Sequence, residues 1–119
     1  MALMKKVMAA FRASPPKQLG DSPVLEMKDY QSLQTLNLAS RQSQSLDAPK
    51  SNMVMLDLGG SGNAVAVRPS GTEPKVKFYF FGVLPPSNAD LASNRQQLRN
   101  RIDSWKQSLK DYIQQVIQG

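Results

Sequence analysis

Hydrophobic residues recur with helical spacing near both ends of the chain. In residues 3–12 the apolar positions fall three or four apart, and Pro15 and Pro16 end the segment. Near the C-terminus a longer apolar stripe repeats at alternating steps of four and three, through Leu98, Ile102, Trp105, Leu109, Tyr112 and Val116. This stripe predicts an amphipathic helix that packs on a sheet; a coiled-coil seam is the alternative.

The middle of the chain carries patterns that are typical of strands. Residues 24–30 alternate between two faces and follow a turn signal at residues 20–23. Residues 53–58 and 63–68 flank a glycine-rich tetrapeptide, which predicts a β-hairpin. Residues 76–81 carry aromatic side chains on both faces, so we expect a strand in a central or well-covered position.

Residues 31–51 are rich in glutamine and serine, and leucine is their only large apolar residue type. We therefore expect a long, flexible surface loop there, in which a helical turn would also be compatible with the sequence. The order of helix, strand, hairpin, strand and helix predicts a single α+β domain over residues 1–119. Its fold would be a four-stranded antiparallel sheet with two helices packed on one face.

Composition excludes several kinds of chemistry. The chain has no cysteine and no histidine, so disulfides, thiolate ligands and imidazole catalysis are absent, and its nine carboxylates form no cluster typical of a metal site. The net charge of +6 favours an anionic partner, either nucleic acid or a sugar phosphate. No apolar run reaches the roughly 18 residues of a membrane span, and the N-terminal apolar stretch is too short for a signal peptide, so we expect a cytoplasmic protein without a membrane partner.

The most informative segment is an octapeptide that begins at Arg68 and reads Arg-Pro-Ser-Gly-Thr-Glu-Pro-Lys. The Arg68 guanidinium can donate two parallel hydrogen bonds to phosphate oxygens, and the hydroxyl groups of Ser70 and Thr72 can converge on the same anion. Gly71 permits backbone conformations that aim successive N–H groups at one point, and Lys75 adds a positive charge. These residues predict a phosphate-binding loop between two strands.

The other residues of the octapeptide have supporting roles in this interpretation. Pro69 and Pro74 fix φ on either side of the loop and reduce the entropy lost when it orders around a ligand. Glu73 would repel a phosphate, so we expect it to brace Arg68 or a backbone amide. An ordinary turn is the competing interpretation, because proline, serine, glycine and threonine are common turn residues.

The octapeptide resembles the phosphate-binding loop of the α-D-phosphohexomutases, the superfamily of phosphoglucomutase and phosphomannomutase. The similarity extends to the helix that ends in two prolines, to Gly20, Val24, Asp29 and Tyr30, and to the strand over residues 75–80. The chain thus resembles the C-terminal, fourth domain of such an enzyme, and the resemblance implies a fold like half of the TATA-binding protein. Residues 46–52 look more like the phosphoglucomutase and phosphopentomutase branches than like typical phosphomannomutases.

The resemblance also implies a function for the parent protein. Such an enzyme of carbohydrate metabolism is an isomerase, an intramolecular phosphotransferase that interconverts sugar 1-phosphate and 6-phosphate through a phosphoserine and a bisphosphorylated intermediate. Its phosphoserine, its magnesium loop and its sugar-recognition loop belong to three other domains, whose motifs this chain lacks. We therefore expect no catalytic residue, metal or cofactor here, magnesium only in the full-length enzyme, and no activity from the isolated 119-residue chain.

Within that enzyme, this domain would grip the phosphate that is not being transferred. The residues that match the family's gripping positions are Arg68, Ser70, Gly71 and Thr72, with Lys75 as a further candidate. The implied partners are a hexose monophosphate or bisphosphate and the preceding domains of the parent enzyme, without nucleic acid.

Two other classes of function compete with this interpretation. The charge and the basic terminal helix are compatible with a nucleic-acid-binding module, but the basic residues are spread round the helix and the sequence does not show exposed aromatics for base stacking. A stand-alone phosphate-sensing or assembly domain could use the long helix as a partner surface. Against it, Trp105 and its stripe are more typical of a core.

Overall fold

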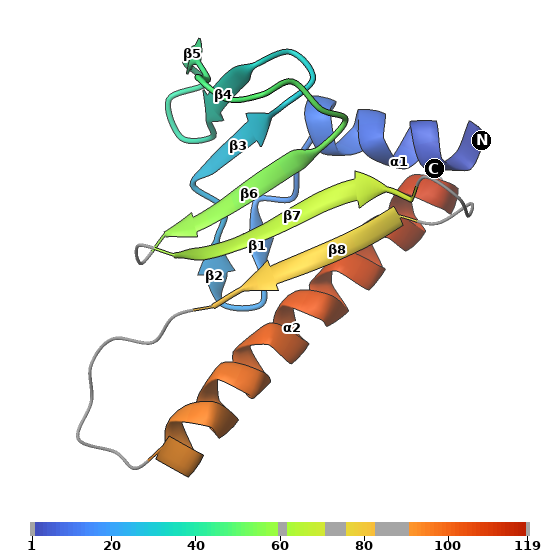
Figure 1. The fold of residues 1–119 in the computed structure, drawn as a ribbon. Coiled ribbons are helices and arrows are strands. Elements are labelled where there is room, and N and C mark those ends of the chain that lie inside the picture. The colour runs from blue at the N-terminus through green and yellow to red at the C-terminus, as the bar shows by residue number, and fades with distance from the viewer. Residues whose placement is uncertain (1, 60–61, 71–75, 83–90, 119) are drawn as a thin grey trace.

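The computed structural model describes residues 2–59, 62–70, 76–82 and 91–118. They form two helices, a six-stranded antiparallel sheet of order β5-β4-β3-β6-β7-β8 and a separate two-stranded sheet, β1-β2 (Figure 1). The elements are α1 (Ala2–Ala13), β1 (Gln18–Leu19), β2 (Ser22–Pro23), β3 (Glu26–Asp29), β4 (Gln34–Asn37), β5 (Ser43–Ser45), β6 (Val54–Gly59), β7 (Asn63–Pro69), β8 (Val76–Phe81) and α2 (Leu91–Gln118). No helix within these described ranges is long and apolar enough to cross a membrane.

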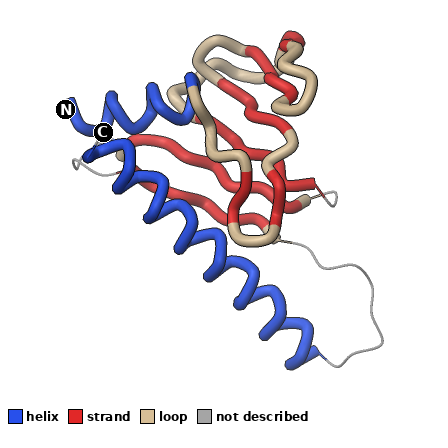
Figure 2. The backbone as a smooth tube through the Cα atoms, turned by 180° about the vertical axis from the view of Figure 1, so that it is seen from behind, coloured by secondary structure: helices blue, strands red, loops and turns tan. Residues whose placement is uncertain are grey.

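Both helices cover the same face of the large sheet, as Figure 2 shows from behind. On this face, apolar side chains alternate along β6 and β7, and Val54, Leu56, Val65 and Val67 are all completely buried. Trp105 of α2 is also completely buried in this core. The predicted α+β class, both helices and the β6–β7 hairpin are therefore confirmed, and the C-terminal apolar stripe packs on a sheet.

An aromatic cluster joins the two helices to β8. The ring of Phe11 in α1 lies 4.8 Å from that of Tyr112 in α2 and 6.5 Å from that of Phe78 in β8, measured between centroids. The Tyr112 hydroxyl donates a hydrogen bond of 2.6 Å to the Ser14 carbonyl at the end of α1, and burial raises the pKa of Tyr112 to about 12. This tyrosine therefore stays neutral and fixes the end of α1 against α2.

The sheet is larger than the predicted four strands because β4 and β5 lie inside residues 31–51, where we expected a loop. A tight turn of residues 37–42 connects the two strands: the Asn37 side-chain oxygen accepts hydrogen bonds from the N–H groups of Ala39 and Ser40, and Arg41 adopts a φ of 62°. Leu36 packs against the core. The polar strand β5 is exposed along its whole length, so no alternation of apolar residues marks it in the sequence.

The strand predicted over residues 76–81 is present as β8, but the central or well-covered position expected for it was wrong. β8 is the last strand of the sheet and pairs only with β7 within the described residues. Phe78 and Phe80 face the helices and pack against the core, whereas Tyr79 and Phe81 remain 41% and 49% exposed on the opposite face. The aromatic residues of β8 therefore lie on two different faces: one face is covered by the helices and the other is open to solvent.

The turn between β1 and β2 packs directly on α2. Gly20 has a φ of 57°, and its N–H donates a hydrogen bond of 2.8 Å to the Ser108 hydroxyl. A Cβ atom at this position would lie 2.9 Å from the Ser104 Cβ. Close by, the Trp105 indole donates a hydrogen bond of 3.1 Å to the Ser22 hydroxyl. Only glycine satisfies both the left-handed backbone and the close approach to the helix.

We therefore expect Gly20→Ala to destabilise the fold by about 1–3 kcal/mol, because it adds both backbone strain and a steric clash. Urea unfolding followed by circular dichroism measures this change. Asp21→Ala in the same exposed turn is the matched control and should stay within about 0.5 kcal/mol of the wild type. Equal stability of the two variants would contradict the close packing of this turn on α2.

Candidate functional site

The predicted phosphate-binding loop begins at the end of β7. Arg68 lies on the sheet face that the helices leave open, and its Cα partner on β8 is Lys77. The Arg68 guanidinium stands over the ring of Tyr79, with 5.9 Å between Cζ and the ring centroid. This contact restrains the long arginine side chain while its charge stays exposed to solvent.

The structure brings together only part of the predicted site. Arg68 is exposed near the end of β7, and Ser70 follows it in a half-buried position. Gly71, Thr72 and Lys75 lie outside the described residues, as does Glu73. The described part of the site therefore consists of Arg68 and Ser70 at one end of the β7–β8 pair.

Sequence reasoning missed two neighbours of Arg68. Lys77 and Tyr79 share its sheet face, because side chains alternate along β8 and the antiparallel register places residue 77 opposite residue 68. The signal was present in the sequence as the alternation of residues 77, 79 and 81 after the loop. The sequence alone does not give the strand register, which places residues 77 and 79 beside Arg68.

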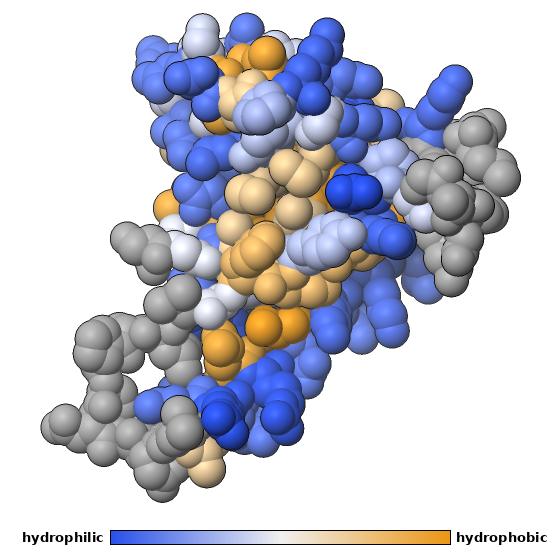
Figure 3. Space-filling view, in the orientation of Figure 1, coloured by the Kyte–Doolittle hydropathy of each residue, from blue (hydrophilic) through white to orange (hydrophobic). Residues whose placement is uncertain are grey.

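The open face of the sheet is largely apolar at its centre, where tan and orange side chains gather over β6, β7 and β8 (Figure 3). Met55, Ala66 and Tyr79 are cross-strand neighbours there, and Ala66 is only 3% exposed although no helix covers this face. With Phe81 beside it, Tyr79 gives the face two exposed aromatic rings. The expectation that no exposed aromatics are available for stacking was therefore wrong.

A second feature lies beside the loop. A hollow of about 570 Å³ opens between α1 and the end of β7, and Lys5, Arg12, Asn52 and Pro69 are among the residues that line it. Lys5 is exposed. This hollow places two further basic side chains near the start of the octapeptide, although they come from α1 near the N-terminus.

Arg12 is held in place by two hydrogen bonds. Its Nε donates to the Asp29 carboxylate at 3.0 Å, and its terminal nitrogen donates to the Asn52 side-chain oxygen at 2.7 Å. Burial alone would raise the pKa of Asp29, but hydrogen bonds from the Gln31 N–H, Arg12 and the Ser32 hydroxyl, together with the Arg12 charge, hold this pKa below its usual value. Asp29 thus ties the end of α1 to β3.

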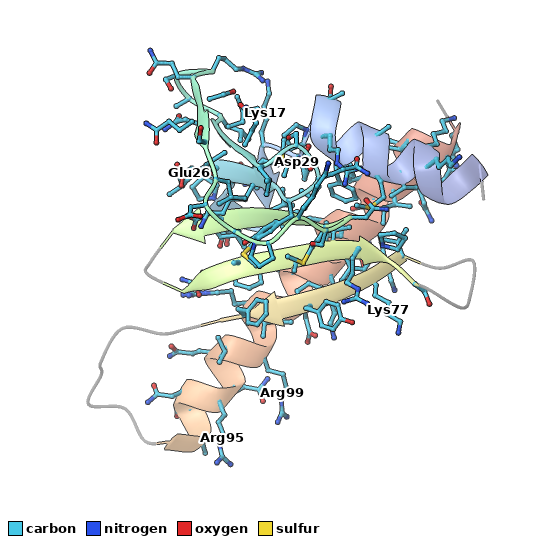
Figure 4. The ribbon with its side chains drawn as sticks, turned by 45° about the horizontal axis from the view of Figure 1, so that its top comes forward. Lys17, Glu26, Asp29, Lys77, Arg95 and Arg99 are labelled. Carbon is cyan, nitrogen blue, oxygen red and sulfur yellow. The ribbon has the colours of Figure 1, made fainter. Side chains whose placement is uncertain are left out.

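Two arginines of α2 lie apart from the basic side chains of the sheet. Figure 4 shows Lys77 at the β8 side of the sheet, whereas Arg95 and Arg99 project from the first turns of α2. Among the described residues, no group of three acidic side chains could hold a metal ion.

Similar proteins found by sequence comparison include phosphoglucomutases from several strains of Staphylococcus aureus. The protein of strain MRSA252 is 36% identical over 78 residues, which is 64% of this chain and 13% of that protein. The protein of strain MSSA476 is 35% identical over the same length, and that of strain USA300 is 36% identical over 75 residues, or 61% of this chain. The chain spans about 13% of the length of these curated relatives.

The octapeptide lies within the matched region. A continuous match over 64% of 119 residues includes residues 45–75 wherever it begins, and these contain the whole loop. The predicted resemblance to phosphoglucomutases is therefore confirmed. No family model and no solved structure matches the chain, so the similarity to the TATA-binding-protein fold stays a prediction.

The geometry around Asp29 predicts an acid-sensitive contribution to stability. Because the pKa of Asp29 is lower in the folded than in the unfolded state, its stabilisation is present above the ordinary value of 3.8 and is lost as the pH falls through the lower folded value. We expect Asp29→Asn to lower the free energy of unfolding by about 1–3 kcal/mol at pH 7 and to reduce its loss in acid. Urea titrations between neutral and acidic pH measure both effects.

Asp47→Asn is the control, because Asp47 is exposed. It should leave the acid dependence of the unfolding free energy unchanged. If Asp29→Asn kept the full acid dependence of the wild type, Asp29 would not be the group responsible.

Proposed function

Because the chain is homologous to one part of the phosphoglucomutases, we propose that it is the substrate-phosphate-binding domain of an enzyme of this type. The parent protein would be an isomerase that interconverts a sugar 1-phosphate and 6-phosphate, through a phosphoserine and a bisphosphorylated intermediate supplied by its other domains. This domain would bind the phosphate that is not being transferred.

One observation carries most of this proposal. Arg68, the first residue of the octapeptide, is exposed at the end of β7 and lies within the region matched by the relatives. Stacking on Tyr79 restrains its side chain, and Lys77 across the strand pair adds a second positive charge. Arg68 is thus partly organised to receive an anion before any ligand binds, which reduces the entropy cost of binding.

Each group in the proposed site has a separate task. The Arg68 guanidinium would give two parallel hydrogen bonds to a phosphate group, each contributing about 1.5–3 kcal/mol before desolvation. Ser70, Gly71 and Thr72 would supply hydroxyl and backbone N–H donors, and Lys75 a further charge. None of these groups needs to gain or lose a proton, so the site binds and orients the substrate while the reacting end lies in another domain.

Binding at a remote phosphate can accelerate a reaction. The binding energy fixes the position of the sugar, so its other end meets the reactive group with less loss of freedom in the transition state. The magnesium ion would be held by another domain and would neutralise charge on the transferred phosphoryl group. The described residues of this chain would therefore contribute by fixing the position of the sugar phosphate.

We expect Arg68→Ala in the full-length enzyme to raise the KM for the sugar phosphate and to lower kcat/KM by at least about tenfold, because it removes both parallel bonds. Arg68→Lys should keep the charge but restore only part of this loss. Steady-state kinetics with glucose 1-phosphate measure both changes. Unchanged constants for Arg68→Ala would contradict the proposal.

Arg99→Ala is the matched control, since Arg99 is equally exposed but projects from α2 (Figure 4). This variant removes the same charge and should retain wild-type kinetics. A similar loss for both variants would indicate a general effect of charge and not binding at the loop.

A second candidate function rests on the open sheet face. Tyr79 and Phe81 are exposed beside Arg68 and Lys77, and aromatic rings next to basic groups are the features that bind single-stranded nucleic acid. This arrangement keeps a nucleic-acid-binding module as the alternative to sugar-phosphate binding.

Fluorescence anisotropy with a labelled single-stranded oligonucleotide distinguishes the two functions. For nucleic-acid binding we expect an affinity that falls steeply with salt and drops by about tenfold or more in Tyr79→Ser/Phe81→Ser, because two stacking surfaces are lost. For a domain that only binds sugar phosphate, anisotropy stays flat at all salt concentrations. A flat titration would end the nucleic-acid alternative.

A further inference from the structure

The outer edge of β8 is open to pairing. β7 pairs with β8 from Pro69 opposite Val76 to Ala64 opposite Phe81, and no described strand pairs with the other edge of β8. Edge strands of soluble proteins are commonly protected by proline, by several charges or by a bulge. β8 contains no proline, its only charged residue is Lys77, and its register with β7 is regular. Its free backbone N–H and C=O groups are therefore suited to accept another strand.

A groove runs beside this edge on the helix side of the sheet. It has a volume of about 440 Å³ and lies between β8 and α2; Figures 1 and 2 show these two elements side by side. Its floor and walls are apolar, formed by Phe78, Phe80, Leu109 and Ile113. Both phenylalanine residues are half-buried: they pack against the hydrophobic core and remain accessible from the groove.

Two lysines border the groove. Lys106 and Lys110 are one turn apart on α2, are exposed, and line the groove together with its apolar residues. The Lys106 ammonium lies 5.6 Å from the centroid of the Phe80 ring. None of the residues that line the groove is acidic, so these two lysines give its margin a positive charge.

We propose that β8 and the groove beside it bind an extended polypeptide segment that alternates apolar and acidic residues. The segment would add to the sheet as a further strand, so its backbone would satisfy the free groups of β8. Because side chains of a strand alternate between two faces, every second one would enter the apolar groove. Acidic side chains at the margin would meet the lysines of α2.

Charge decides against a second copy of this chain as the occupant. Antiparallel pairing of two β8 strands would put the helix sides of both copies on the same face of the joined sheet, with Lys106 and Lys110 of each copy beside the new strand pair, and like charges in such positions repel. An acidic and apolar segment avoids this repulsion. The proposal concerns the helix side and outer edge of β8, and it uses none of the groups that would bind phosphate.

The direct test uses a fluorescein-labelled, acetylated peptide of alternating leucine and glutamate, as long as β8. We expect saturable binding by fluorescence polarisation, and slower hydrogen exchange in residues 76–81 when the peptide is bound. A peptide methylated on alternate backbone nitrogens, which cannot form the ladder along β8, should bind at least about tenfold more weakly. Equal binding of the methylated peptide, or no binding of the parent peptide, would overturn the proposal.

Variants test the role of the lysines. The double variant Lys106→Glu/Lys110→Glu should bind the leucine–glutamate peptide at least about tenfold more weakly than the wild type does. It should instead prefer a peptide of alternating leucine and lysine. Lys5→Glu/Lys6→Glu on α1 changes the net charge equally at exposed positions outside the groove, and should bind like the wild type. Equal loss in both double variants would show nonspecific charge attraction instead. Sedimentation in which the peptide dissociates a dimer paired through β8 would identify a second copy as the occupant and also overturn the proposal.

Discussion

The structure depends on the burial of one face of the β6–β7 hairpin. Val54, Leu56, Val65 and Val67 are completely buried there, and each such side chain contributes about 1.5–3 kcal/mol to the folded state. Both helices cover this face with the apolar side of each, and Trp105 fixes the position of α2 upon it. The open sheet face, the end of β7 and the outer edge of β8 are then left accessible.

The elements with strong periodicity could be predicted from the sequence. Both helices and the β6–β7 hairpin have apolar positions at regular spacing, because each buries one face. β4 and β5 could not be predicted, since β5 is an exposed edge strand and no residue of β4 is fully buried, so neither strand carries a clear apolar alternation. The position of β8 was also misjudged: an aromatic residue that stands on an open face, such as Tyr79, has the same sequence pattern as one that is covered.

The residues of the candidate site also fall into two groups: those that belong to the sequence motif and those that tertiary packing brings next to it. Arg68 and Ser70 were singled out because their motif is contiguous and its chemistry is local, and their phosphate-binding role stays a prediction. Their neighbours could not, because Tyr79 reaches Arg68 through strand register, and Arg12 meets Asp29 across 17 positions of the chain. Such pairs follow from tertiary packing, and no short sequence pattern encodes them.

The direct pairing of β7 with β8 has a thermodynamic consequence. Arg68 lies on β7 and the outer edge lies on β8, so the two proposed sites are connected by the backbone hydrogen bonds between these strands. A ligand that orders the β7–β8 pair at one of these sites would reduce the conformational entropy that is lost when a second ligand binds at the other site. By linkage, each would raise the affinity of the other by the same factor. The two proposed sites are therefore chemically separate but only one strand apart.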